Sequence, residues 1–243
     1  MFWQAQRGFL TNVALQATSV PPVLTYRSGV LATGTGTSQT ATALSIGAAS
    51  ARKMVIVSFT GDSAITGADP TMTITPNVGT AKSGIKAILA TDNTDPILGI
   101  YYAVLDADSD TATTVDLSVT LPNNPFVGIY FNIWTVPSAS LSSSTPTDSK
   151  FARNSSATSL SVTTLSTSSG GFIVAAGCSG NFATGSSAYS GSETTTMRNN
   201  ASASSACHTC ADASSVAAHS GDCTVTATFT TADNVGLGAV SWR

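Results

Sequence analysis

The chain has 243 residues and a formal net charge of −3, and only 9% of its residues are charged, against about a quarter in a typical soluble domain. Ser, Thr, Ala and Gly take the place of the missing charge, which argues against a helical bundle and favours an all-β chain with a buried core. The chain has only ten Lys and Arg residues, too few for a basic surface that binds nucleic acid. It has no run of about 18 apolar residues, so we expect no membrane-spanning segment.

The first 30 residues are expected to form an N-terminal arm (1–30), which Pro21 and Pro22 separate from the remainder. A short apolar run after Arg7 resembles a signal peptide, but polar residues interrupt it, so we expect no cleavage. The arm is too apolar to stay a free tail and should dock on the chain's own body or on a partner. Its docking residues are expected to be Phe2, Trp3, Phe9 and Leu10.

Two kinds of strand are predicted farther along the chain. Apolar and polar residues alternate over 115–121, 160–163 and 223–229, which predicts half-exposed antiparallel strands because successive side chains of a strand point to opposite faces. Longer runs that are apolar on both faces predict central strands. These runs are MVIVSF (54–59), ILGIYYAVL (97–105), VGIYFNIWTV (127–136), FIVAAGC (172–178) and VGLGAVSW (235–242).

The two halves of the chain resemble each other. TVDLSVTLPNNPFVGIYFNIW (114–134) and TVTATFTTADNVGLGAVSW (224–242) share an alternating strand, a turn and a VG-led apolar strand that ends at tryptophan. Upstream, residues 42–63 resemble residues 158–180 in the same way. Each half should therefore contribute a similar set of strands.

This repeat predicts a domain organisation. One β-sandwich domain over 31–243 would consist of two quasi-repeated halves, 31–136 and 157–243, joined by a Ser-rich crossover at 137–156. The expected fold class is all-β, an antiparallel jelly-roll-like sandwich with an N-terminal arm. The alternative is two separate small sandwiches.

The stretch ACHTCADASSVAAHSGDC (206–223) holds three of the four cysteines and both histidines. We expect it to form a loop before the penultimate strand, fastened by disulfides. A bridge between Cys207 and Cys210 would close a very small loop and leave two other cysteines to join strand ends. The disulfide candidates are Cys178, Cys207, Cys210 and Cys223, and their pairing stays open.

Other chemistries could also use this stretch, and free thiols are one alternative. A second is a tetrahedral zinc site made by the Cys-x2-Cys pair with His219 and Cys223, although a structural zinc domain usually lacks a large core of its own. Nucleophilic catalysis would need an oriented base and an oxyanion site, and no motif provides them. The GDS sequence at 61–63 resembles the nucleophile block of SGNH-type esterases, but no Asp-x-x-His block follows. We therefore expect no enzyme activity and no cofactor.

An acidic segment, LDADSDTATTVD (105–116), has carboxylates at alternate positions, as in loops that wrap Ca²⁺. The EF-hand pattern also needs Gly and Glu where this chain has Thr111 and Leu117. We favour an acidic hairpin turn and assign no metal site. The weak calcium candidates are Asp106, Asp108 and Asp110.

Several phrases of the sequence resemble β-sandwich accessory proteins of tailed bacteriophage virions. In the first half they are KMVIVSFTGDSAITGADPTMTITPNVGTAKSGIKAI, ILGIYYAVL, TATTVDLSVTL and VGIYFNIWTV, and in the second half GGFIVAAGCSGN and TVTATFTTADNVGLGAVSW. The resemblance covers residues 30–243 and is one of pattern, without a catalytic signature. It implies a structural virion protein that decorates or reinforces a capsid, neck or tail, or forms fibres.

The same resemblance implies other virion structural proteins as partners, assembly in the host cytoplasm and release by lysis into the virion's surroundings. Exposed strand edges and low charge add the expectation of a homo-oligomer. The runner-up function is a receptor- or glycan-binding adhesin domain, for which Tyr189 is the best exposed aromatic residue.

Overall fold

The computed structural model describes residues 21–32, 36–50, 52–62, 68–90, 96–122, 127–180, 188–203 and 206–243. Within these ranges the chain consists of β-strands and their connections, with one 3₁₀ turn at Ser138–Ser140 and no α-helix. No helix there is long and apolar enough to cross a membrane. The prediction of an all-β antiparallel chain is confirmed.

The first half of the chain forms two sheets that face each other. In pairing order, sheet A contains β1 (Thr25–Leu31), β9 (Val127–Pro137), β3 (Lys53–Asp62), β7 (Ile97–Leu105) and β6 (Ile85–Ala90). Sheet B contains β2 (Ser38–Ser45), β8 (Thr114–Thr120), β4 (Thr71–Pro76) and β5 (Lys82–Ser83). A core that includes Val57, Phe59, Leu117 and Val119 fills the space between the two sheets.

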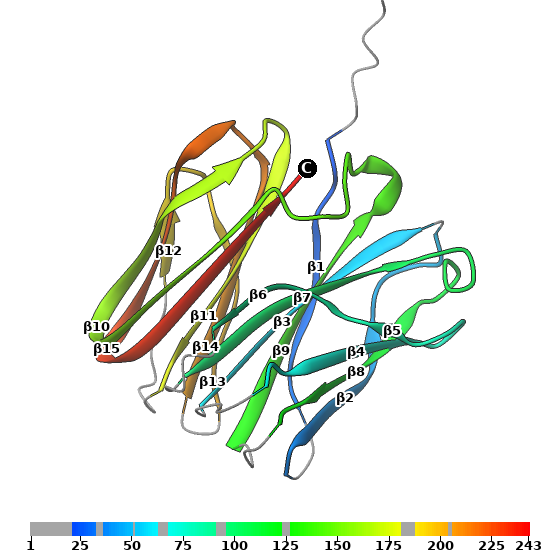
Figure 1. The fold of residues 1–243 in the computed structure, drawn as a ribbon, viewed down its shortest axis with the longest axis horizontal. Coiled ribbons are helices and arrows are strands. Elements are labelled where there is room, and N and C mark those ends of the chain that lie inside the picture. Colours follow the sequence, from blue (N-terminus) through cyan, green and yellow to red (C-terminus); the bar gives the residue numbers. More distant parts are fainter. Residues whose placement is uncertain are drawn as a thin grey trace, which may run out of the picture.

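The second half forms sheet C. In pairing order its strands are β10 (Asp148–Thr167), β15 (His219–Trp242), β11 (Gly171–Ser179), β14 (Ala206–Val216) and β13 (Thr196–Ala203), and β12 (Ala188–Gly191) pairs with β15 as well. Sheet C covers the face of sheet A that sheet B leaves free, so that sheet A lies in the middle (Figure 1).

Sheet C folds back on itself and thereby makes two layers. The long β10–β15 ladder has register shifts between Asn154 and Ser159, and it turns over in this region (Figure 1). Residues 157–167 of β10, 219–229 of β15 and β12 then form an outer layer. A shared core joins this layer to β11 and β14, because Leu165 and Val225 lie in one cluster with Ile173 and Ala213.

The two halves have the same strand order. In sheet A, β1, the first strand of the half, lies at one edge and pairs with β9, the last strand of the half; β3, β7 and β6 follow. The inner layer of sheet C has the equivalent order β10, β15, β11, β14 and β13. The outer layers correspond too, with β2-β8-β4 matched by the second part of β10, the first part of β15 and β12. The molecule is a stack of two similar sandwiches whose inner sheets face each other.

The sequence predicted the centre of each half well. All five runs expected as central strands lie in sheet A or in the inner layer of sheet C, and the alternations at 115–121 and 223–229 bury their apolar residues as expected. The acidic segment connects β7 of sheet A to β8 of sheet B, so it is a turn between sheets rather than a hairpin.

The expected loop at 206–223 is the main correction. Residues 206–216 form β14, a strand paired on both sides, with β11 and β13. Its first eight residues, ACHTCADA, are all buried. The sequence did not predict this strand because several of its residues are polar. Their hydrogen-bond partners lie in sheet A, far away along the chain: His208 and its partner Thr60 are about 150 residues apart.

Candidate functional site

The contact between sheet A and sheet C gathers most of the chemically notable side chains of the chain. It has an approximate two-fold arrangement, since β3 packs on its counterpart β11, β6 on β10 and β15, and β13 on β1 and β9. Trp134, near the end of β9, and Trp242, the last residue of β15, are both fully buried in this contact. We call the contacts of β13 and β14 with β1, β3 and β9 the polar side, and those of β6 and β7 with β10, β11 and β15 the apolar side.

His208 crosses the polar side of this contact. Its Nδ1 lies 2.8 Å from the Oγ1 of Thr60 on β3, and its ring stacks on that of Tyr130 with centroids 5.4 Å apart. The Sγ of Cys178, opposite His208 in the sheet, is 3.9 Å from the same nitrogen. His208 is completely buried, so it contributes to the contact between the halves and has no access to a substrate in solution.

Asp212 makes a second polar tie from β14 to sheet A. The indole Nε1 of Trp134 donates to its Oδ2 at 2.8 Å, and Arg198 donates two hydrogen bonds from Nε and Nη2 at 2.7 and 2.9 Å. This carboxylate raises the pKa of the Arg198 guanidinium. A carboxylate that is 2% exposed is therefore fully paired.

Asn132 joins three strands on the same side. Its Oδ1 accepts from the Nδ2 of Asn199 at 3.0 Å and from the hydroxyl of Tyr26 at 3.3 Å, while its own Nδ2 donates to Ser58 at 3.4 Å. A Cβ at Gly29 would lie 2.2 Å from the Asn199 amide, so only glycine permits this approach. Burial raises the pKa of Tyr26, which keeps its hydroxyl protonated as a donor.

All four cysteines are buried and none forms a disulfide, so the structure does not support the predicted disulfides. Cys207 and Cys210 are three positions apart on one strand and point to opposite faces, Cys210 into the contact with sheet A and Cys207 into the core of sheet C. Cys223 lies in the outer layer. Cys178 pairs with His208, and Cys210 with Ala176, so the two thiols on the inner face are only diagonal neighbours.

Burial also disfavours the reactive form of three of these thiols. It raises the pKa values of Cys207, Cys210 and Cys223, which disfavours the nucleophilic thiolate. Within the described residues no group of His, Cys, Asp or Glu is arranged to hold a metal ion. The structure does not bring the residues of the zinc hypothesis together, because His219 bonds Glu193 at 2.7 Å and Asp222 at 3.3 Å in the outer layer, whereas Cys210 faces sheet A.

The acidic turn has a cation of its own. Lys82 Nζ lies 2.8 Å from Asp106 Oδ1 and 3.1 Å from Asp108 Oδ1, where the calcium hypothesis would place the ion. Thr80 and Ser109 donate further hydrogen bonds to Asp108, and these bonds together with Lys82 lower the pKa of its carboxyl. Asp110 belongs to no ion pair among the described residues.

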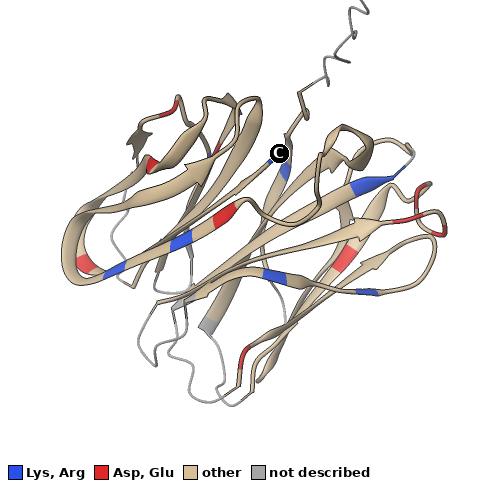
Figure 2. Ribbon diagram, turned by 45° about the horizontal axis from the view of Figure 1, so that its top comes forward, with Lys and Arg blue, Asp and Glu red and all other residues tan. Residues whose placement is uncertain are grey.

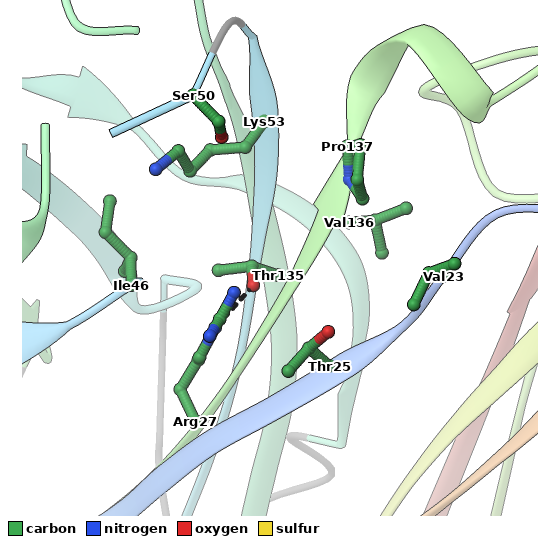
Figure 3. A pocket seen from close by; sticks show the side chains of 9 residues that line it. All are labelled: Val23, Thr25, Arg27, Ile46, Ser50, Lys53, Thr135, Val136 and Pro137. Atoms are coloured by element: carbon green, nitrogen blue, oxygen red, sulfur yellow. Dashed lines mark hydrogen bonds between the residues drawn. The ribbon is translucent and has the colours of Figure 1, made fainter. Parts of the chain in front are cut away.

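A small pocket opens at one end of the sandwich formed by sheets A and B (Figure 3). Its volume is about 80 Å³. Its charged lining residues are Arg27 from β1 and Lys53 from β3; Arg27 donates from Nε to the Oγ1 of Thr135 at 2.7 Å. The other lining residues are Val23, Thr25, Ile46, Ser50, Thr135, Val136 and Pro137.

The N-terminal docking residues and the exposed aromatic residue Tyr189 were also predicted from the sequence. The docking residues Phe2, Trp3, Phe9 and Leu10 lie outside the described residues. Tyr189, expected as an exposed aromatic, packs against the core of sheet C with a buried hydroxyl, and this burial raises its pKa. It is therefore no exposed sugar platform.

Sequence reasoning missed Arg27, Lys53, Asp212 and Arg198. A signal for Asp212 was present, because His208, Cys210 and Asp212 occupy alternate positions and share a strand face. No local signal joins Arg27 to Lys53, which come together only when β1 and β3 pair with opposite edges of β9.

No protein-family model and no curated protein sequence matches this chain. A solved structure from cucumber leaf spot virus matches 90% of this chain and 96% of its own at 11% identity, with a TM-score of 0.18. An X-ray structure of melon necrotic spot virus matches the same shares of the two chains at 8% identity, with a TM-score of 0.19. Similarity at this level carries no argument about fold or function.

Proposed function

We propose that this chain is a structural protein of a tailed-bacteriophage virion, where it decorates or reinforces the capsid, neck or tail through protein–protein contacts. The sequence resemblance over residues 30–243 is the first support. The proposal includes no catalytic step, assembly in the host cytoplasm and release by lysis.

The observation that carries the proposal is the internal use of reactive side chains. His208 and Asp212 bond partners in the facing sheet, and the cysteines are buried. In an enzyme such groups would meet in an open cleft with a base and an acid within reach of a substrate. A stack of layers held together in this way is suited to bearing contacts on its outside.

Attachment is assigned to the N-terminal segment. Its apolar residues Phe2, Trp3, Phe9 and Leu10 would bury area on a neighbouring virion protein, since aromatic residues are enriched at such interfaces. Association between copies of the chain is assigned to the edges of the inner sheets. There Ile85 on β6 is 53% exposed and Met197 on the corresponding strand β13 is 44% exposed.

The test is incorporation of a truncated chain into particles. Deleting residues 1–19 should abolish incorporation while the purified protein keeps the thermal midpoint of the full chain. Val78→Ser on an exposed turn is the matched control for loss of surface apolar area, and it should be incorporated normally. Normal incorporation of the truncated chain would refute attachment through this segment. Saturable binding of the isolated protein to a defined glycan would favour the adhesin function instead.

A further inference from the structure

Two cations, Arg27 and Lys53, line the small pocket in a molecule whose charged side chains are sparse (Figure 2). Lys82, Lys86, Lys150 and Arg198 each contact a carboxylate. Arg27 and Lys53 contact only neutral groups of the described residues, although they line one pocket. No acidic residue is among its lining residues. The pocket therefore holds two positive charges without a counter-charge from the described chain.

Lys53 is the more unusual of the two. Its side chain is 3% exposed, and its Nζ donates to the backbone carbonyls of Ala48 and Ala112, both at 3.0 Å. Burial of an ammonium group without an opposite charge is unfavourable, and burial followed by the nearby positive charge of Arg27 lowers the pKa of Lys53. Two of its three N–H donors are satisfied by carbonyl oxygens, which leaves one donor for a further acceptor.

Arg27 is held in place by one donor, and its other donors have no partner among the described residues. Its Nε bonds Thr135, and the remainder of the guanidinium lies over Gly47. A Cβ at Gly47 would be 2.5 Å from Nη2 and 2.6 Å from Cζ of Arg27, and the φ of Gly47 is +87°. The positive φ favours glycine at this position, and the absence of a side chain leaves room for the guanidinium beside the pocket.

The corresponding edge of the second half lacks this arrangement. There β10, the counterpart of β1, carries Asp148, which lies 3.4 Å from Lys150 and accepts from the backbone amides of Ser149 and Ser166. That charged group is neutralised within its own half.

We propose that this pocket binds one small tetrahedral oxyanion, of the phosphate or sulfate class. Figure 3 shows Lys53 and Ser50 on one side of the pocket and Arg27, bonded to Thr135, on the other. A tetrahedral anion presents oxygen atoms in both directions, whereas a carboxylate presents both of its oxygens on one side. The hydroxyls of Thr25 and Ser50 supply neutral donors beside the two cations. The volume of about 80 Å³ exceeds the roughly 10–15 Å³ that one water needs by the same measure.

The test uses the full chain and inorganic phosphate. Phosphate should raise the thermal midpoint saturably at constant ionic strength, and calorimetric titration should show binding to one site. Sulfate should compete, whereas acetate should not. Arg27→Gln should weaken phosphate binding at least about tenfold, because it removes a charge-assisted donor. Arg52→Gln is the matched control, since Arg52 is next to Lys53 in the sequence but does not line the pocket.

Three results would overturn the proposal. Phosphate and sulfate stabilise many proteins because they are excluded from the protein surface. A rise in the thermal midpoint that does not saturate and is equal in the parent and in Arg27→Gln would therefore mean that no site exists. Equal loss of binding in Arg52→Gln would point to general surface charge. Binding of acetate as strong as that of phosphate would exclude a site for tetrahedral anions.

Discussion

The polar and apolar sides of the contact between the two halves occupy equivalent places in the fold but differ in chemistry. Across sheet A, the row two residues before Trp134 reads Asn132, Ser58 and Ile100 in pairing order. The corresponding row across sheet C, two residues before Trp242, reads Val240, Val174 and Asp212.

Two polar residues and one apolar residue in the first half thus match two apolar residues and one polar residue in the second. This exchange places polar residues of both sheets together on one side. Buried polar groups need hydrogen-bond partners, so the polar groups on this side are satisfied only when the facing sheet lies in one particular position. The apolar side, where Tyr102 contacts Trp242 edge to face at 6.0 Å, supplies buried area without such a requirement. The apolar side therefore supplies affinity between the halves, and the polar side fixes their relative orientation.

The largest expected effect tests the equivalence of the two tryptophans. Trp134→Ala and Trp242→Ala should each lower the free energy of unfolding by about 3–5 kcal/mol, because each leaves a large cavity in a fully buried contact. Chemical denaturation measures both, with the exposed Val78→Ala as control. A loss below about 1 kcal/mol for either variant would be typical of a surface position and would contradict the equivalence.

Asp212→Leu is expected to have the next largest effect and probes the polar side alone. It leaves the Trp134 indole and the Arg198 guanidinium without their acceptor, at a cost of about 1–3 kcal/mol. In a Trp134→Phe background the indole donor is already gone, so the same substitution should cost less. Additive losses in this double-mutant cycle would mean that the two residues do not act together. Ile100→Val, at the matching position of the first half, should cost about 0.5–1.5 kcal/mol.

The outer layers should differ in pH dependence, a smaller effect. The hydrogen bond that His219 donates to Glu193, and then the one that it donates to Asp222, raise the pKa of His219. A folded-state pKa above the unfolded value gives stability that is fully present below the unfolded pKa of about 6.5 and is lost as pH rises through the folded value. His219→Gln should therefore reduce stability below pH 6 and have little effect at pH 9, as measured by thermal unfolding.

The charged cluster in the first half should behave in the opposite way. Asp108 has a lowered pKa, so its contribution is present above the usual carboxyl pKa and is lost only in strong acid as pH falls through the folded value. Asp108→Asn should leave the stability profile between pH 6 and 9 parallel to that of the parent. A change of slope in that range would contradict the assignment of the titration near neutral pH to His219 in the second half.

Reduction of the cysteines should have no effect on stability, the smallest of the expected changes. A reductant should leave the thermal midpoint unchanged, because none of the four cysteines forms a disulfide. A thiol reagent should label them slowly in the folded protein and completely in denaturant without reductant. A fall in the midpoint on reduction, or fewer than four labelled thiols after denaturation, would restore a disulfide.

The sequence predicted those parts of the fold whose signal is local. Val115, Leu117 and Val119 alternate with polar residues and form β8 as expected, and the VG-led runs that end at Trp134 and Trp242 revealed the repeat. β14 was missed because His208, Cys210 and Asp212 look polar or reactive in isolation. Their burial depends on Thr60 and Trp134, whose positions only the assembled sheets determine. The pocket was missed for the same reason.

The long strands of the second half have a mechanical consequence. The end of β15 is paired on both sides, by β10 and β11, so a pull on the C-terminus must shear two ladders at once. β1, which follows the N-terminal segment, lies at the edge of sheet A and pairs with β9 alone among the described strands. A load applied through the N-terminal segment would therefore peel β1 away before the second half yields, and a chain tethered in this way would give way at its first strand while the remaining layers stay folded.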